Sequence, residues 1–150
     1  GKMVADENMP QMEVMVKGML NKEVLPDLIR HYILFHKNKE EIIKIVPRYH
    51  QYFAVNKAVE TTRVATAIDG DQRAGVIWHT QGSGKSYSMV FLCEKIHRKL
   101  GGAYTFLIAV DRTELENQLY DTFSGVGVVN DKNVVAGKKS GITGREHLRE

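Results

Sequence analysis

Residues 74–86 read Ala-Gly-Val-Ile-Trp-His-Thr-Gln-Gly-Ser-Gly-Lys-Ser, and this stretch decides the fold. An apolar run ends in a turn marked by glycines, and the turn closes on a Lys-Ser pair that opens a helical pattern through Leu100. Such a turn, followed by a helix N-terminus, directs backbone N–H groups at one point and so favours an anion. The stretch therefore predicts a site for the phosphates of a nucleotide.

The pattern of a phosphate-binding loop is Gly-x-x-x-x-Gly-Lys-[Ser/Thr], and here His79 stands in place of the first glycine. Lys85 is predicted to reach the β- and γ-phosphates, and the Ser86 hydroxyl to ligate Mg²⁺; we assign catalysis to these two residues. A glycine-rich connection without a ligand is the plainer alternative, but it leaves Lys85 and Ser86 at the helix start unexplained. The other loop residues expected to bind the nucleotide are Thr80, Gln81, Gly82, Ser83 and Gly84.

One helix upstream, residues 47–52 read Pro-Arg-Tyr-His-Gln-Tyr. A glutamine side chain offers both a donor and an acceptor, so Gln51 is predicted to hold N6 and N7 of an adenine together. Arg48 and Tyr49 supply a guanidinium and a ring that can stack on the base. Taken alone, Gln51 is an ordinary polar helix residue. Its position just upstream of the phosphate loop favours the nucleotide role.

Downstream of the loop, residues 103–110 form a second continuous apolar run, which predicts a strand buried on both faces. Residues 111–115 then read Asp-Arg-Thr-Glu-Leu. Ligands gather at the carboxyl ends of strands in open α/β sheets, so Arg112 and Thr113 are predicted to contact a nucleic-acid backbone. A helix cap with a surface arginine explains the same residues about equally well.

The order strand, helix, strand over residues 74–110 is a βαβ unit, which predicts the α/β class with a parallel sheet. Upstream, residues 12–20, 26–35 and 48–68 have helical spacing, and residues 42–46 form a short β-branched run stopped by proline. We expect residues 1–47 to be a short helical connector. Residues 48–150 are expected to form the N-terminal portion of an α/β lobe.

Composition bounds the function without deciding it. The 150 residues are 43% hydrophobic, enough for one compact core, and a net charge of +3 permits nucleic-acid binding without arguing for it. The single cysteine, Cys93, excludes an internal disulfide and is interpreted as a small buried side chain. No stretch has membrane-spanning length and no secretory signal opens the chain, so a cytoplasmic location with no membrane partner is expected.

Three motifs, at residues 48–52, 79–86 and 111–115, occur in an order that resembles the motor (R) subunit of type I restriction enzymes. The histidine within the phosphate loop is part of this likeness. The resemblance spans roughly residue 12 to the C-terminus, and residues 51–123 carry its specific part.

The resemblance implies superfamily 2 helicase-like motor lobes of RecA-like P-loop fold, which translocate double-stranded DNA using ATP and Mg²⁺. It also implies an upstream nuclease domain, with methylation and specificity subunits as partners. By the same likeness, Gln51 matches the adenine-reading residue, and Lys85 and Ser86 match the residues for ATP and Mg²⁺. Arg112 and Thr113 match the first DNA-tracking motif.

The chain departs from this family in lacking a D-E-x-H or D-E-A-D box, a second lobe with its arginine finger, and the nuclease acidic residues. Asn130-Asp131 imitates the missing box only superficially, because Lys132 follows. We therefore expect the ATP-binding part of a DNA translocase and endonuclease, inactive as an isolated fragment. The alternatives are a free-standing nucleotide-binding regulatory module and, less favoured, a small P-loop phosphotransferase.

Overall fold

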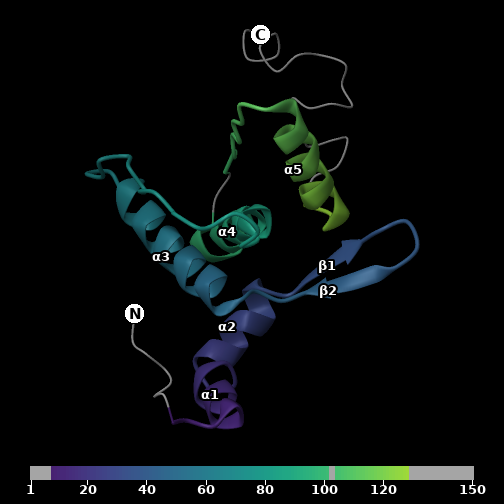
Figure 1. Ribbon diagram of the computed structural model, residues 1–150. Helices are drawn as coiled ribbons and strands as arrows, with labels where there is room; N and C mark the ends of the chain where they lie inside the picture. The colour runs from purple at the N-terminus through teal and green to yellow at the C-terminus, as the bar shows by residue number, and fades with distance from the viewer. Residues whose placement is uncertain (1–7, 102–103, 129–150) are drawn as a thin grey trace, which may run out of the picture.

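The computed structural model describes residues 8–101 and 104–128, and Figure 1 shows the arrangement of their elements. In chain order these elements are α1 (Gln11–Gly18), α2 (Val24–His31), β1 (Leu34–Lys37), β2 (Ile42–Ile45), α3 (Tyr49–Ala65), α4 (Lys85–Leu100) and α5 (Thr113–Gly125). The two strands form an antiparallel hairpin in which Leu34 lies opposite Ile45. None of the helices in these residues is long and apolar enough to cross a bilayer.

The centre of the molecule is the pair of long helices α3 and α4, which pack side by side. Their apolar residues recur at helical spacing, so each helix turns one stripe toward the other. This core also receives residues from the neighbouring elements α2, β1 and α5. Its fully buried or nearly buried members are Leu28, Tyr32, Leu34, Val55, Val59, Val90, Phe91, Cys93, Ile96 and Phe123.

Cys93 lies within this core on α4, which confirms the interpretation of a small buried side chain. Burial raises the pKa of its thiol to about 11. The thiol is therefore protonated at neutral pH, and a protonated thiol is a poor nucleophile.

The helices predicted over residues 12–20, 48–68 and 87–100 are confirmed within a few residues at each end. Gly101, with a φ of 61°, ends α4 in the left-handed region. The helix predicted over residues 26–35 is partly wrong, because α2 stops at His31 and Phe35 belongs to β1. The physical reason is the hairpin, since residues 34–37 pair with the β-branched run of β2 and leave Phe35 on the exposed face.

Helix α1 forms as predicted, but none of its residues is buried in the described part of the chain. Its apolar side chains at Met12, Met15 and Val16 are 66%, 42% and 48% exposed. These side chains therefore lie outside the hydrophobic core of the described residues.

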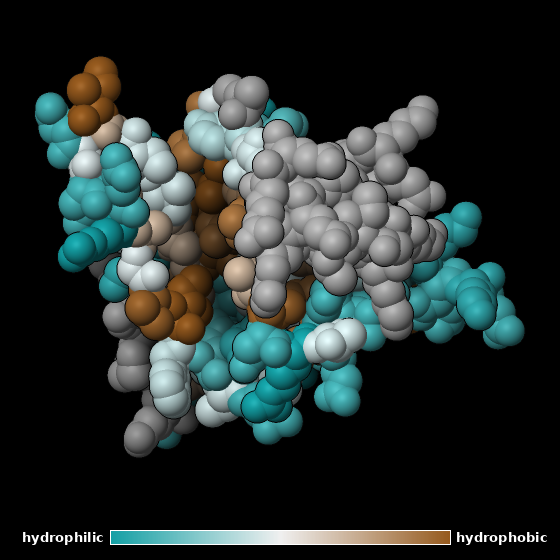
Figure 2. All heavy atoms as spheres, turned by 90° about the horizontal axis from the view of Figure 1, so that it is seen from above, coloured by the Kyte–Doolittle hydropathy of each residue, from teal (hydrophilic) through white to brown (hydrophobic). Residues whose placement is uncertain are grey.

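Residues 74–78 and 104–110, predicted as strands, carry no strand in the structure. Val76, Trp78 and Leu107 are 94%, 89% and 76% exposed, and Figure 2 shows apolar side chains reaching the surface on the face seen from above. A parallel strand is stable only between neighbouring strands and beneath helices, and one short pair does not supply them. The RecA-like parallel sheet stays a prediction.

Asn130 and Asp131, which superficially imitate the missing D-E-x-H box, lie outside the described residues.

Because Phe91 has no exposed surface and Phe53 is 51% exposed, the two phenylalanines test this account of the core. We expect Phe91→Ala to lower the free energy of unfolding by about 3–5 kcal/mol, from lost burial and the cavity left behind. Phe53→Ala is the matched control, with an expected loss below about 1 kcal/mol. Urea denaturation of both variants measures the difference, and equal losses would contradict the assignment of the core.

Candidate nucleotide-binding site

The glycine-rich turn leads directly into α4. The helix begins at Lys85, and Gly84 before it has a φ of 81°, in the left-handed region. Gly82 has a φ of 75° in the same turn. Residues with a side chain rarely adopt this conformation, so both glycines permit the sharp reversal of the chain. The first N–H groups of α4, which have no partner within the helix, consequently lie beside the turn.

Lys85 folds back over the turn from the first position of α4. Its ammonium donates to the carbonyl oxygens of His79 and Thr80, at 3.1 and 2.9 Å. The backbone N–H of Ser83 donates to the Thr80 carbonyl at 3.3 Å and tightens the same turn. The lysine ammonium therefore lies against the carbonyl oxygens of the turn, where its positive charge can attract an anion.

Gln51, in the first turn of α3, binds the loop from the other side. Its side-chain Nε2 donates to the Gly84 carbonyl at 2.9 Å and to Ser88 Oγ at 3.3 Å. Its Oε1 accepts from the backbone N–H of Arg48 at 2.8 Å, and the residue is only 5% exposed. A Cβ added at Gly84 would lie 2.7 Å from Gln51 Nε2. Gly84 is thus required for this close approach as well as for its backbone conformation.

His50 makes a second contact between α3 and the loop. Its Nε2 lies 3.1 Å from the carbonyl oxygen of Ser83, at hydrogen-bonding distance. Its ring stands edge-on to the ring of His79, with the centroids 5.0 Å apart. The histidine that replaces the first glycine of the motif therefore packs against α3. Sequence reasoning gave His50 no role, although it lies beside Gln51 in the quoted motif.

Two polar atoms of the loop are buried and have no hydrogen-bond partner among the described residues. They are the hydroxyl oxygen of Ser83 and Nδ1 of His79. A buried polar group without a partner is costly, and a bound ligand or water normally satisfies it. An oxygen-rich ligand such as a phosphate matches these atoms, the free helix N–H groups and the charge of Lys85.

The structure brings together only some of the predicted site residues. Those that meet at the loop are Gln51, Thr80, Gly82, Ser83, Gly84, Lys85 and Ser86. Arg48 and Tyr49 are exposed at the start of α3, and Gln81 is exposed in the turn.

Arg112 and Thr113 lie elsewhere, at the exposed start of α5. Neither residue has a hydrogen bond or an ion pair with the loop in the described part of the chain, and the described residues between α4 and α5 contain no strand. Their predicted contact with DNA stays a prediction. Across residues 8–101 and 104–128, no group of three or more His, Cys, Asp or Glu side chains is arranged to hold a metal ion.

Comparison with known proteins shows the family of the chain. The sequence model of the SWI2/SNF2 ATPase family matches residues 50–149. The chain is 37% identical over 143 residues to the type I restriction enzyme HindI endonuclease subunit of Haemophilus influenzae, covering 93% of this chain and 13% of that protein. It is 34% identical over 120 residues to the putative type I restriction enzyme MjaIXP endonuclease subunit of Methanocaldococcus jannaschii, covering 77% of this chain and 11% of that protein.

A second M. jannaschii relative, the putative MjaVIIP endonuclease subunit, is 33% identical over 114 residues, which are 72% of this chain and 10% of that protein. No solved structure matches the chain. The matched segment begins within the first turn of α3 and contains the phosphate loop, so the family likeness and the geometry of the site coincide. The chain belongs to the SWI2/SNF2 ATPase family, among the relatives of type I restriction enzyme endonuclease subunits.

Proposed function

We propose that the phosphate loop binds the phosphates of ATP together with Mg²⁺. The observation that carries the proposal is the turn itself, where Lys85, free helix N–H groups and two unpartnered buried polar atoms lie together. The ATPase family match supports the use of ATP.

In this proposal Lys85 exchanges the carbonyls of His79 and Thr80 for the β- and γ-phosphate oxygens. A charge-assisted hydrogen bond to phosphate is stronger than one to a neutral carbonyl, so the exchange is favourable. The Ser83 hydroxyl, buried without a partner, gains an acceptor in a phosphate oxygen. Ser86, the second residue of α4, supplies the hydroxyl that ligates Mg²⁺. When bound, Mg²⁺ would supply positive charge that offsets the charge of the phosphates during phosphoryl transfer.

For the whole protein, we propose an ATP-dependent translocase and endonuclease subunit of a type I restriction enzyme. The chain spans only 10–13% of the length of the curated relatives described above. Double-stranded DNA, with Arg112 and Thr113 among its contacts, and the methylation and specificity subunits of the complex are therefore proposed partners. A cytoplasmic location is proposed with them. A free-standing nucleotide-binding module is the second candidate, and it shares the same phosphate site.

Removing the lysine ammonium tests the phosphate site. We expect Lys85→Ala to weaken ATP binding by about 10- to 100-fold, because charged hydrogen bonds of about 1.5–3 kcal/mol are lost. Isothermal titration calorimetry on the full-length protein measures the change in ATP affinity. Lys99→Ala, at the exposed far end of the same helix, is the matched control. Equal ATP affinity in wild type and Lys85→Ala would refute the assignment.

The preference for ATP over GTP tests the predicted contact of Gln51 with the adenine base. Both donors of its amide are engaged by Gly84 and Ser88, so reading adenine requires it to release the longer contact to Ser88. We expect Gln51→Ala to weaken ATP binding and to narrow the preference for ATP over GTP, because guanine presents O6 where adenine presents a donor. Competition binding measures both quantities, with the exposed Gln118→Ala as control. An unchanged preference for ATP over GTP would show that Gln51 holds the loop but does not recognise the base.

Hydrolysis by the 150-residue chain tests how much of the catalytic machinery it holds. We expect no measurable ATPase activity, with or without duplex DNA, because an arginine finger alone contributes on the order of 10³–10⁵ in rate. The measurement is phosphate release from purified chain, with Lys85→Ala as the control. DNA-stimulated turnover that disappears in the control would show a complete site and make Asp131 the leading additional Mg²⁺ ligand.

A further inference from the structure

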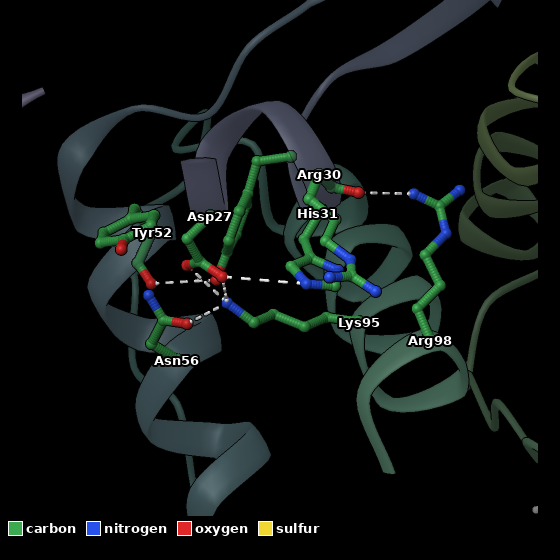
Figure 3. A network of polar contacts seen from close by, with 8 residues as sticks. Asp27, Arg30, His31, Tyr52, Asn56, Lys95 and Arg98 are labelled. Atoms are coloured by element: carbon green, nitrogen blue, oxygen red, sulfur yellow. Dashed lines mark hydrogen bonds and ion pairs between the residues drawn. The ribbon is translucent and has the colours of Figure 1, made fainter. Parts of the chain in front are cut away.

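Lys95 is buried at the junction of three helices, away from the phosphate loop. It lies on α4 and is only 1% exposed. Its ammonium donates to both carboxylate oxygens of Asp27 on α2, each at 2.6 Å, and to the Asn56 side-chain oxygen on α3 at 2.5 Å. Figure 3 shows the three side chains converging from their separate helices. One nitrogen atom therefore connects α2, α3 and α4.

Two tyrosine rings enclose the ammonium. Its nitrogen lies 4.6 Å from the ring centroid of Tyr32 and 5.9 Å from that of Tyr52. The Tyr32 hydroxyl also donates to the backbone carbonyl oxygen of Tyr52 at 3.4 Å. Burial raises the pKa of Asp27, but the hydrogen bond and charge of Lys95 outweigh it and hold that pKa below its ordinary value. The carboxylate is thus kept ionised beside the lysine at neutral pH.

This cluster lies on the same two helices that shape the phosphate loop. Asn56 follows Gln51 by five positions on α3, and Tyr52 is the next residue after Gln51. On α4, Lys95 is ten positions beyond Lys85, which corresponds to about 15 Å along a helix. The two helices are therefore linked by polar contacts at two levels, Gln51 to Gly84 near the loop and Asn56 to Lys95 farther along.

Apolar packing between α3 and α4 tolerates small slides and rotations of one helix against the other. The Lys95 ammonium, in contrast, can keep its hydrogen bonds to both Asp27 and Asn56 in only one arrangement of the helices. Replacing a buried ion pair by apolar groups is often neutral for stability, so the use of charge here points to specificity of arrangement. We propose that Lys95 is a positioning residue for the phosphate loop. By fixing α3 against α4, it holds Gln51 and His50 on the carbonyls of Gly84 and Ser83. The inference rests on the proposed ATP site.

The test is steady-state ATPase kinetics on the full-length protein carrying Lys95→Met. We expect the KM for ATP to rise about tenfold while kcat changes less than about twofold, because the loop is held less well before ATP binds. Val59→Ala is the matched control, since it weakens the same helix pair in the apolar core outside the cluster. Both are compared well below their unfolding temperatures. An equal rise in Val59→Ala, or an unchanged KM in Lys95→Met, would overturn the inference.

Asn56→Ala provides a second variant in case Lys95→Met does not fold. It removes the acceptor on α3 and leaves the ion pair of Lys95 with Asp27 in place. We expect about a threefold rise in KM, and faster hydrogen exchange of residues 79–88 without nucleotide than in Val59→Ala. Unchanged exchange and KM would overturn the inference. Lys85→Ala separates the two claims, because unimpaired ATP binding in that variant would refute the proposed function instead.

Discussion

The hydrogen bond from Gln51 Nε2 to the Gly84 carbonyl, 2.9 Å long, joins the beginning of α3 to the beginning of α4. It acts across 33 positions of sequence and buries the glutamine against the turn. The left-handed backbone of Gly84 and the absence of a Cβ there both permit it. In the described residues no strand supports the loop, so α3 is the element that gives the loop its shape. His50, on the carbonyl of Ser83, adds the second contact.

The segment before residue 48 belongs to the same core as these helices. Tyr32, directly after α2, and Leu34 of β1 are buried with residues of α3 and α4. Asp27 of α2 reaches the buried ammonium of Lys95. The division between a connector and a lobe at residues 47 and 48 stays a prediction, but the two segments share one hydrophobic core. A movement of the N-terminal segment would therefore also shift α4, the helix that directly follows the phosphate loop.

Sequence reasoning succeeded where structure is local. Helical periodicity correctly predicted α3 and α4, because the backbone hydrogen bonds of a helix are made within its own segment. The Gly-Lys-Ser pattern correctly predicted the position of the turn. It failed for residues 74–78 and 104–110, since a parallel strand depends on neighbours distant in sequence. It also missed Lys95, because a lysine among helical residues ordinarily indicates a solvent-exposed position. Only the fold shows that Asp27, 68 positions earlier, is its partner.

The central claim is that the turn of residues 79–84, closed by Lys85 and held by Gln51, binds the phosphates of ATP. The most direct measurement is hydrogen–deuterium exchange of the peptide covering residues 79–88 in the parent protein, with and without Mg²⁺–ATP. The account predicts that ATP slows exchange of these amides, because backbone N–H groups of the loop and of the α4 N-terminus become hydrogen-bonded to phosphate. Unchanged exchange in this peptide under saturating Mg²⁺–ATP would contradict it.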